Sequence, residues 1–439
     1  MHERLREKHH RASAAALRGL IQDARRRTLL LIDGLSEAQL MGPRLPTVNP
    51  LRWEIGHVAH FYAALVLRQL GDRGEVLPGQ DELYDSFIVD HDDRWELPLP
   101  STRDTLRFMA EVQSRVLEAL SGEPDPSETY LCLLAVQHED MHDEAFLMTR
   151  QTLEYPAPPL PRERDPRTAE AGPLPGDVEI PGGRFALGAS PDSPFVFDNE
   201  KWGHALELEP FRIARAPVTN REFAEFVEQR GYERRELWSY QGWRWRTKTA
   251  AQHPGHWRAQ DGRWEARAFD AWRPLASDAP VIHVCWYEAE AFCRWAGRRL
   301  PTELEWEVAA SGEPDGERLS ARRRRFPWGD EPATPERGNL DAWWGEPVDV
   351  AALPEGDSAF GCRQMLGNVW EWTASPFYPY PGFVIDHPYR EYSAPWFGYH
   401  KVLRGGAWFS RARLLRNTFR NFYLPDRRDV LAGFRSCAP

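Results

Sequence analysis

A proline-rich segment divides this 439-residue chain into two parts of different character. Residues 156–176 read PAPPLPRERDPRTAEAGPLPG, with frequent proline and charge and no hydrophobic periodicity, a pattern typical of a linker. A chain of this length is too long for one ordinary hydrophobic core. We therefore expect a domain at residues 1–155, a linker at residues 156–176 and a second domain at residues 177–439.

The first of these parts carries hydrophobic patterns of helical period. Apolar residues recur at three- and four-residue spacing in the stretches 15–35, 49–70, 101–120 and 127–153. Helix start signals support two of them, since Asn49-Pro50 opens one and Ser101 is followed by Asp104 in the other. The pattern predicts a four-helix bundle in which residues 71–100 form a long loop between the second and third helices.

The second part changes to short β-type runs punctuated by glycine and proline. These runs lie at 178–188, 211–220, 401–409 and 431–437, and helical patterns lie at 220–231 and 287–311. This combination predicts a mixed α+β domain with much irregular structure. The chain has 19 tryptophans, most of them after residue 200, and we expect most to form core and a few to line a ligand site.

Composition excludes several classes of protein. A net charge of -11 argues against a nucleic-acid or anionic-membrane partner. No apolar run reaches the roughly 18–20 residues of a membrane span, and the N-terminus lacks the apolar core of a secretory signal. Five scattered cysteines without a CxxC pair indicate reduced thiols, so we expect a cytoplasmic protein.

The sequence VQHEDMHDEAF, residues 136–146, indicates a metal site. His138 and His142 are one helical turn apart, so one ion can take both imidazoles. The same spacing occurs in zinc peptidases, where the intervening glutamate is the general base. A peptidase of the extended motif needs glycine and histidine at the positions of Ala145 and Met148. The other peptidase form needs a glutamate on the next helix, but the nearby Glu163 lies in the expected linker. The peptidase hypothesis is therefore disfavoured.

A third ligand is available upstream, in the phrase WEIGHVAHF. It places His57 and His60 on the second predicted helix, and a bundle can present inward side chains from facing helices to one ion. Glu139 and Asp143 flank the histidine pair. We expect them to support the imidazoles by hydrogen bonding or to form salt bridges within the bundle.

Five phrases occur in this order after residue 200: PVTNREFAEFV, AFCRWAGRRLPTELEWEVAA, GNVWEWTAS, VLRGGAW and GFR. Together they resemble the formylglycine-generating-enzyme-like domain, a variant of the C-type lectin fold. The true formylglycine-generating enzymes carry a cysteine pair just after the RGGSW-type strand. The corresponding segment here, RGGAWFSRARLLRNTFR, has no cysteine. The resemblance therefore implies a substrate-binding domain without that oxidative activity.

The whole chain resembles the ergothioneine-biosynthesis sulfoxide synthases (EgtB type) and the related selenoneine synthases (SenA type), with a DinB-like four-helix bundle first. GHVAHF, HEDMHDEAF, GNVWEW, RGGAW and FRNFYLPDRRDVLAGFR carry this resemblance. It implies a nonheme Fe(II) held by His57, His138 and His142, with O2 as co-substrate. It also implies formation of a C–S or C–Se bond at C2 of the imidazole of hercynine.

The resemblance also assigns substrate-binding residues. Asn421 falls where the family uses an asparagine on hercynine, and Phe422 matches a family aromatic that can face the trimethylammonium group. Arg427 and Arg428, with Arg94 from HDDRW, are candidates for the second substrate or a carboxylate.

Two departures from the mycobacterial pattern bear on the donor. That pattern is Asn-Trp-Asp, whereas this chain has Asn421-Phe422-Tyr423, and Met141 replaces a polar glutamine. The missing carboxylate would have held the ammonium of γ-glutamyl-cysteine. We therefore favour a selenosugar donor and selenoneine synthesis, with γ-glutamyl-cysteine or cysteine and sulfoxide synthesis as the alternative.

Enzymes of this family use a tyrosine as proton or hydrogen donor. The segment after residue 375 offers Tyr378, Tyr380, Tyr389 and Tyr392, among which the sequence does not choose; we take Tyr380 and Tyr389 as candidates and Trp370 as an aromatic contact. Two remote alternatives remain. One is a DinB-like thiol transferase that uses zinc, and the other is a binding protein without catalytic activity.

Overall fold

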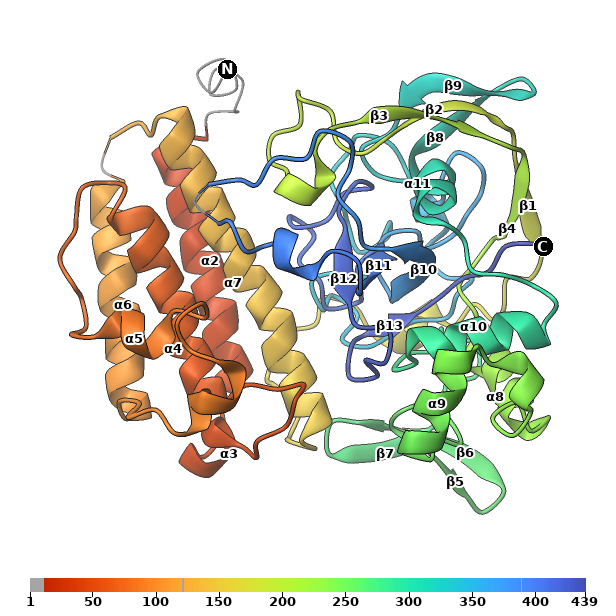
Figure 1. Ribbon diagram of the computed structural model, residues 1–439, viewed down its shortest axis with the longest axis horizontal. Helices are drawn as coiled ribbons and strands as arrows, with labels where there is room; N and C mark the ends of the chain where they lie inside the picture. The colour runs from red at the N-terminus through yellow and green to blue at the C-terminus, as the bar shows by residue number, and fades with distance from the viewer. Residues whose placement is uncertain (1–11, 121, 388) are drawn as a thin grey trace. The chain divides into compact units, whose positions relative to one another are not determined.

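The computed structural model describes residues 12–120, 122–387 and 389–439, which form two compact units (Figure 1). The first contains the chain up to Leu160 together with Pro191–Phe195. The second contains Pro161–Ser190 and Val196–Pro439. The part of the expected linker from Pro161 onward thus belongs to the second unit. It is bonded there through backbone N–H groups, such as those of Glu163 and Arg164, which donate to the carbonyl oxygen of Trp343 at 2.9 and 3.0 Å.

The first unit is helical. Its helices are α2 (Ala14–Ile32), α3 (Glu37–Met41), α4 (Leu51–Tyr62), α5 (Gln80–Tyr84), α6 (Thr102–Ala119) and α7 (Pro126–Thr152), with a π-helical turn at Ala63–Leu67 and a 3-10 turn at His91–Trp95. The four long helices pack as a bundle in which α2 lies against α7, and α4 lies against both α6 and α7 (Figure 1). Buried Ile21, Val58, Val112 and Leu134 fill its centre, one from each helix. The predicted four-helix bundle is confirmed.

Residues 71–100, which the sequence predicts to be a loop, contain α5 and the 3-10 turn at His91–Trp95. Segments of five residues are too short to show helical periodicity, which explains why the pattern missed them. Tyr84, the last residue of α5, is fully buried and its ring stacks on Phe108 of α6 at 5.9 Å between centroids. The loop is therefore anchored to the bundle.

The second unit mixes strands, helices and irregular segments. The strands are β1 (Asp177–Ile180), β2 (Gly183–Leu187), β3 (His204–Leu208), β4 (Phe211–Ala214), β5 (Trp257–Gln260), β6 (Arg263–Ala268), β7 (Ala271–Pro274), β8 (Gly312–Asp315), β9 (Arg318–Arg323), β10 (Trp370–Pro376), β11 (Lys401–Arg404), β12 (Asn421–Tyr423) and β13 (Ala432–Gly433). The helices are α8 (Asn220–Glu228), α9 (Tyr240–Thr249), α10 (Trp286–Trp295) and α11 (Glu303–Ser311), with 3-10 turns at Pro166–Ala169, Asp198–Glu200, Arg235–Leu237, Pro354–Gly356 and Ala394–Trp396. The predicted α+β class is confirmed.

A four-stranded sheet with the order β12-β11-β10-β13 lies at the centre of this unit. The pairs β12–β11 and β11–β10 are antiparallel, whereas β10 and β13 run parallel. Trp306, Trp370 and Trp372 are fully buried in or beside the sheet. The indole N–H of Trp306 donates to Glu371, and that of Trp372 donates to the carbonyl oxygen of Val284. These rings form core, as expected of most tryptophans in the chain.

The helical pattern at residues 287–311 proves to be two helices. The chain leaves α10 through Gly297, which has a positive φ of 64°, a conformation that glycine adopts without strain. Pro301 follows, and the Thr302 side chain caps α11 in a capping box with Glu305. The hydrophobic pattern did not indicate α9 or the three-stranded sheet β5-β6-β7, whose strands are short and mostly half-buried or exposed.

A buried network of charges joins α11 to the central sheet. Arg404 donates to Glu303 at 2.8 Å and to Glu307 at 2.5 Å, and Arg420 donates to both oxygens of Glu303. Burial by itself would raise the pKa of Glu303, but the guanidinium groups of Arg420 and Arg404 outweigh it and lower that pKa. The hydroxyl of Tyr380 also donates to Glu303, at 3.2 Å.

Replacing Arg404 with methionine tests this network. The change leaves Glu307 buried without its closest cation, which costs about 3–5 kcal/mol and lowers the unfolding midpoint by roughly 10 °C in calorimetry. Arg322→Met is the matched control, because that arginine is 70% exposed and 3.7 Å from Glu313. It should change stability by less than about 0.5 kcal/mol. Equal midpoints for the two variants would contradict the assignment.

Candidate metal centre

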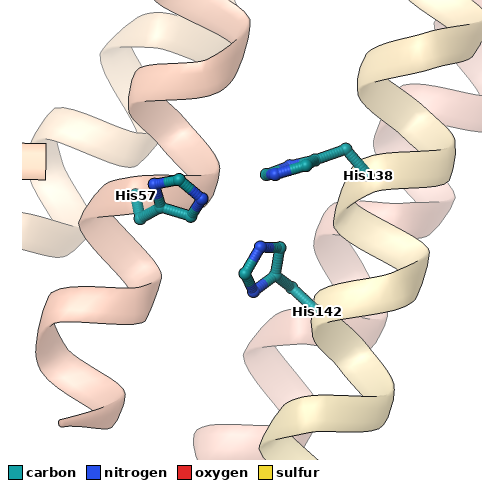
Figure 2. A group of neighbouring side chains, drawn as sticks. All are labelled: His57, His138 and His142. Carbon is teal, nitrogen blue, oxygen red and sulfur yellow. The ribbon is translucent and has the colours of Figure 1, made fainter. Parts of the chain in front are cut away.

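Three histidines from two helices of the bundle turn their rings toward one another. His57 lies on α4, and His138 and His142 lie on α7 (Figure 2). One nitrogen from each ring lies within 4.8 Å of the other two. The ring centroids are 5.1 Å apart for His57 and His138, 4.9 Å for His57 and His142, and 4.5 Å for His138 and His142.

Helix geometry accounts for this arrangement. An i,i+4 pair lies on one helix face, so His138 and His142 point the same way from α7. That helix is fixed at its start by a capping box of Asp125 and Glu128 with Pro126 at its first position. Because α4 packs against α7, His57 approaches the pair from the facing helix.

The orientation of His57 depends on a backbone acceptor. Its Nδ1 lies 2.8 Å from the carbonyl oxygen of Tyr84, which can only accept a hydrogen bond. Nδ1 therefore carries the proton, and Nε2 keeps the lone pair needed to bind a metal. The Trp53 ring stacks on the face of this imidazole, with 4.8 Å between ring centroids and an interplanar angle of 10°.

Glycine at position 56 is required for this contact. A Cβ on Gly56 would lie 2.1 Å from the Tyr84 ring, far closer than any real contact. The absence of a side chain therefore lets Tyr84 pack directly on α4, where its carbonyl reaches His57. The sequence pattern GH at residues 56–57 thus has a packing reason.

His142 is oriented by a carboxylate. Its Nδ1 lies 2.6 Å from Oε1 of Glu54, which is fully buried on α4. The same argument places the proton on Nδ1 and the lone pair on Nε2, since a carboxylate oxygen accepts the hydrogen bond. Such carboxylate–histidine pairs commonly support metal ligands.

His138 is held by ring stacking. Phe61 of α4 lies parallel to it, with 3.6 Å between centroids and an interplanar angle of 5°. Only 1% of its surface is exposed. The apolar ring fixes the plane of the imidazole.

The electrostatic environment keeps two of these imidazoles neutral. Burial lowers the pKa of His57 and of His138 well below 6.5, and the neighbouring His142 lowers both further. A neutral imidazole has the lone pair that metal binding needs. Two ligands about 2.1 Å from one ion lie at most about 4.2 Å apart, so the observed spacing needs only a small inward ring movement. The three residues fit a divalent transition metal such as iron or zinc.

The other polar residues singled out by the sequence lie outside this group. Nε2 of His60 bonds Oδ1 of Asp81 at 2.8 Å. Glu139 accepts from Arg25 at 2.8 Å, and the hydroxyl of Thr28 lies 2.9 Å from both Glu139 and Asp143. We expected Glu139 and Asp143 either to support the imidazoles or to form salt bridges within the bundle. The structure shows contacts of the second kind, within the bundle.

The carboxylate that supports an imidazole is Glu54, which the sequence analysis missed. It precedes His57 by three residues in WEIGH, so the two lie on one face of α4. This spacing was the available signal. The contribution of Tyr84 through its backbone could not be read from side-chain types.

Arg94 packs on Trp53, the ring that stacks on His57. Its guanidinium is 3.9 Å from the centre of the Trp53 ring, and it donates to Oδ1 of Asn49 at 2.7 Å. Burial lowers its pKa to about 10. Met141 is half-buried on α7, next to His142.

In the second unit, the three residues of β12 are half-buried. Oδ1 of Asn421 accepts from its neighbour's backbone at 2.9 Å, Phe422 stacks on Phe377 at 4.1 Å, and the Arg427 guanidinium lies 5.1 Å from the Tyr423 ring centre. Arg427 pairs with Asp429, and Arg428 pairs with Glu288 at 3.0 Å. Both of these arginines therefore have a carboxylate partner.

The candidate tyrosines occupy different surroundings. Tyr380 is buried with its hydroxyl on Glu303, and burial raises its pKa well above 10. Tyr389 is half-buried beside Tyr392, with ring centroids 5.4 Å apart, and burial raises its pKa as well. Trp370 is buried, 5.8 Å from the ring of Phe419.

All five cysteines are buried and free. Burial raises the pKa of each thiol, to about 11 for Cys362 and about 12 for Cys132 and Cys437. Thiols of this kind are poor nucleophiles. This agrees with the lack of a cysteine pair after the RGGAW strand.

Within the part of the chain that the structure describes, no helix has both the length and the apolar character of a membrane span.

Comparison with known families matches both units. The model of the sulfatase-modifying factor enzyme 1-like domain matches residues 162–438, and that of the DinB superfamily matches residues 20–145. The formylglycine-generating enzyme of Streptomyces coelicolor is 32% identical over 60% of this chain and 88% of its own length. The chain is thus a two-domain protein with a DinB-type bundle and a sulfatase-modifying-factor domain.

Two relatives match almost end to end. The hercynine oxygenase of Mycolicibacterium thermoresistibile is 40% identical over 97% of this chain and 94% of its own length. That of Mycobacterium tuberculosis is 39% identical over 94% of this chain and 96% of its own length. The chain belongs to the hercynine oxygenase family, as the sequence resemblance predicted.

Substituting alanine for Gly56 tests how the site is built. The added methyl group displaces Tyr84 and with it the acceptor of His57, so affinity for Co(II) should fall about 10-fold or more. Overpacking should also cost about 1–3 kcal/mol. Calorimetry and competitive metal titration measure the two effects.

Gly19→Ala is the matched control, because Gly19 also lies within a helix, α2, and a Cβ there meets nothing within 4 Å. It should keep the metal affinity and raise stability by up to about 1 kcal/mol. A Gly56→Ala variant with unaltered affinity would show that Tyr84 does not orient the ligand.

Proposed function

We propose that this chain is an Fe(II)-dependent hercynine oxygenase that joins sulfur to C2 of the hercynine imidazole. The observation that carries the proposal is the three-imidazole group of His57, His138 and His142. The near full-length similarity to two hercynine oxygenases supports hercynine as the substrate.

The proposed reaction balances with O2 as the only oxidant. The C2–H bond of hercynine and the S–H bond of a thiol donor break, and a C–S bond and an S–O bond form. One oxygen atom enters the sulfoxide and the other leaves as water, so O2 takes up four electrons. A bound Fe(II) supplies the redox chemistry that makes O2 reactive.

The chain's own residues prepare the site for that ion. The N–H at Nδ1 of His57 donates to the carbonyl oxygen of Tyr84, and the N–H at Nδ1 of His142 donates to Glu54. Both Nε2 atoms are therefore available to bind a metal. Trp53 and Phe61 cover the rings of His57 and His138 and keep water from those faces. These contacts hold the ligands in place before an ion arrives.

For hercynine we propose that Asn421 and Phe422 contribute to binding. The Phe422 ring is kept flat on Phe377, so its orientation is set before substrate arrives. A trimethylammonium group is attracted to aromatic faces and makes no N–H hydrogen bond. Arg94 is proposed for a donor carboxylate. Arg427 and Arg428 receive no substrate role, because each already has a carboxylate partner.

The relatives give the expected selenosugar donor no support, and we propose a thiol donor, either γ-glutamyl-cysteine or cysteine. The Phe422-Tyr423 pair and Met141 are the observations that favoured selenium, and they now bear on which thiol is used. Tyr423 replaces a carboxylate with a phenol, which favours a donor without an ammonium group at that point.

The function is tested by incubating the Fe(II)-loaded chain with hercynine and O2 and one donor at a time. Mass spectrometry should show the sulfoxide with a thiol donor and no product after iron removal. Alanine at His57, His138 or His142 should abolish both product and stoichiometric iron. Full iron occupancy in all three variants would sink the assignment, and product only with a selenosugar would restore the selenium hypothesis.

A second variant tests donor selection. Tyr423→Asp restores a carboxylate, so the KM for γ-glutamyl-cysteine should fall about 10-fold while the KM for hercynine stays within about twofold. Tyr423→Asn has a similar size without charge and is the control. An unchanged KM for γ-glutamyl-cysteine in the aspartate variant would exclude Tyr423 from donor binding.

A further inference from the structure

The carboxylate of Glu54 has an unusual environment for a fully buried acid. Its Oε1 bonds Nδ1 of His142 at 2.6 Å. Its Oε2 is buried and has no hydrogen-bond partner among the described residues. No lysine or arginine in the described part of the chain forms an ion pair with it. A buried carboxylate without a cation is costly, so its presence requires an explanation.

Two other buried carboxylates of the bundle lie close to an arginine. Glu139 lies 2.8 Å from Nε of Arg25, and Asp143 lies 4.0 Å from Nε of Arg27. Arg94 is near enough for the charge of Glu54 to affect its pKa, but its hydrogen bonds go to Asn49 and to the carbonyl oxygen of Val89. The bundle thus pairs an arginine directly with Glu139 and leaves Glu54 on an imidazole.

The three ligands also differ in what lies behind them. His57 donates to a neutral peptide carbonyl, His138 is stacked on Phe61, and His142 donates to a carboxylate. A carboxylate polarises the N–H bond more than a carbonyl does and makes the opposite nitrogen the stronger donor. His142 is therefore a more electron-rich ligand than His57.

We infer that Glu54 is a positioning residue whose charge is balanced by the metal ion bound through His142. It fixes the tautomer of that ligand, raises the affinity for a divalent ion and stabilises the oxidised, more positive state of a redox metal. The inference rests on the proposed function only in that it takes the three histidines as the metal site.

Glu54→Gln is the deciding variant. Glutamine keeps the size of the side chain and can still accept the N–H of His142, so the change removes charge while preserving shape. Affinity for Co(II), used as a probe ion, should fall 10–100-fold. The Fe(III)/Fe(II) midpoint potential of the loaded protein should become more positive. The thermal midpoint of the metal-free chain should not fall, because a buried charge has been removed.

Glu139→Gln is the matched control, since it removes an equally buried carboxylate next in sequence to a ligand. It should lower the thermal midpoint by breaking the contact with Arg25, and it should leave Co(II) affinity within about threefold. An unchanged affinity and potential in Glu54→Gln would overturn the inference. So would an equal loss of affinity in the Glu139 variant.

These failures are distinguishable from failure of the function. If the wild-type chain binds neither Co(II) nor Fe(II), the metal site itself is wrong. If the wild type binds both ions and Glu54→Gln binds them equally well, the metal site stands and the role proposed for Glu54 is wrong.

Discussion

The site depends on two hydrogen bonds that fix which nitrogen of an imidazole carries its proton. A histidine buried among helices can present either nitrogen, and only the deprotonated one can bind a metal. In this bundle the Tyr84 carbonyl and the Glu54 carboxylate each occupy Nδ1 of one histidine. Much of the surrounding structure follows from this requirement: α5 docks on α4 to bring the carbonyl, and Gly56 gives it room.

Burial of such polar groups destabilises the folded state unless partners compensate for the lost water. Arginines compensate for most of the buried glutamates in the part of the chain that the structure describes, and Glu54 differs from them. In the second unit, arginines surround Glu303 and Glu307, so opposite charges balance inside the core. In the bundle the same solution serves Glu139, whereas Glu54 faces an imidazole. Breaking a buried pair is more damaging than never having it, so each network is a strong constraint on sequence. The difference distinguishes a structural carboxylate from one that supports a ligand.

The sequence predicted the parts of the site that depend on local spacing. The i,i+4 histidine pair follows from helix periodicity, and the bundle follows from four long amphipathic patterns. The choice of His57 over His60 needed the family resemblance, because both lie on α4; the structure turns His60 to Asp81. Tyr84 escaped prediction because α5 is too short for a periodic pattern and because the contact uses its backbone. Glu54 escaped because a glutamate on a helix is usually solvated.

Iron K-edge X-ray absorption on the chain loaded with one equivalent of Fe(II) tests the central claim most directly. We predict a first shell with three imidazole nitrogens in the wild type and no imidazole shell in the His142→Ala variant, because that variant loses stoichiometric iron. A wild-type shell without imidazole, or a three-imidazole shell that the substitution leaves unchanged, would contradict this assignment.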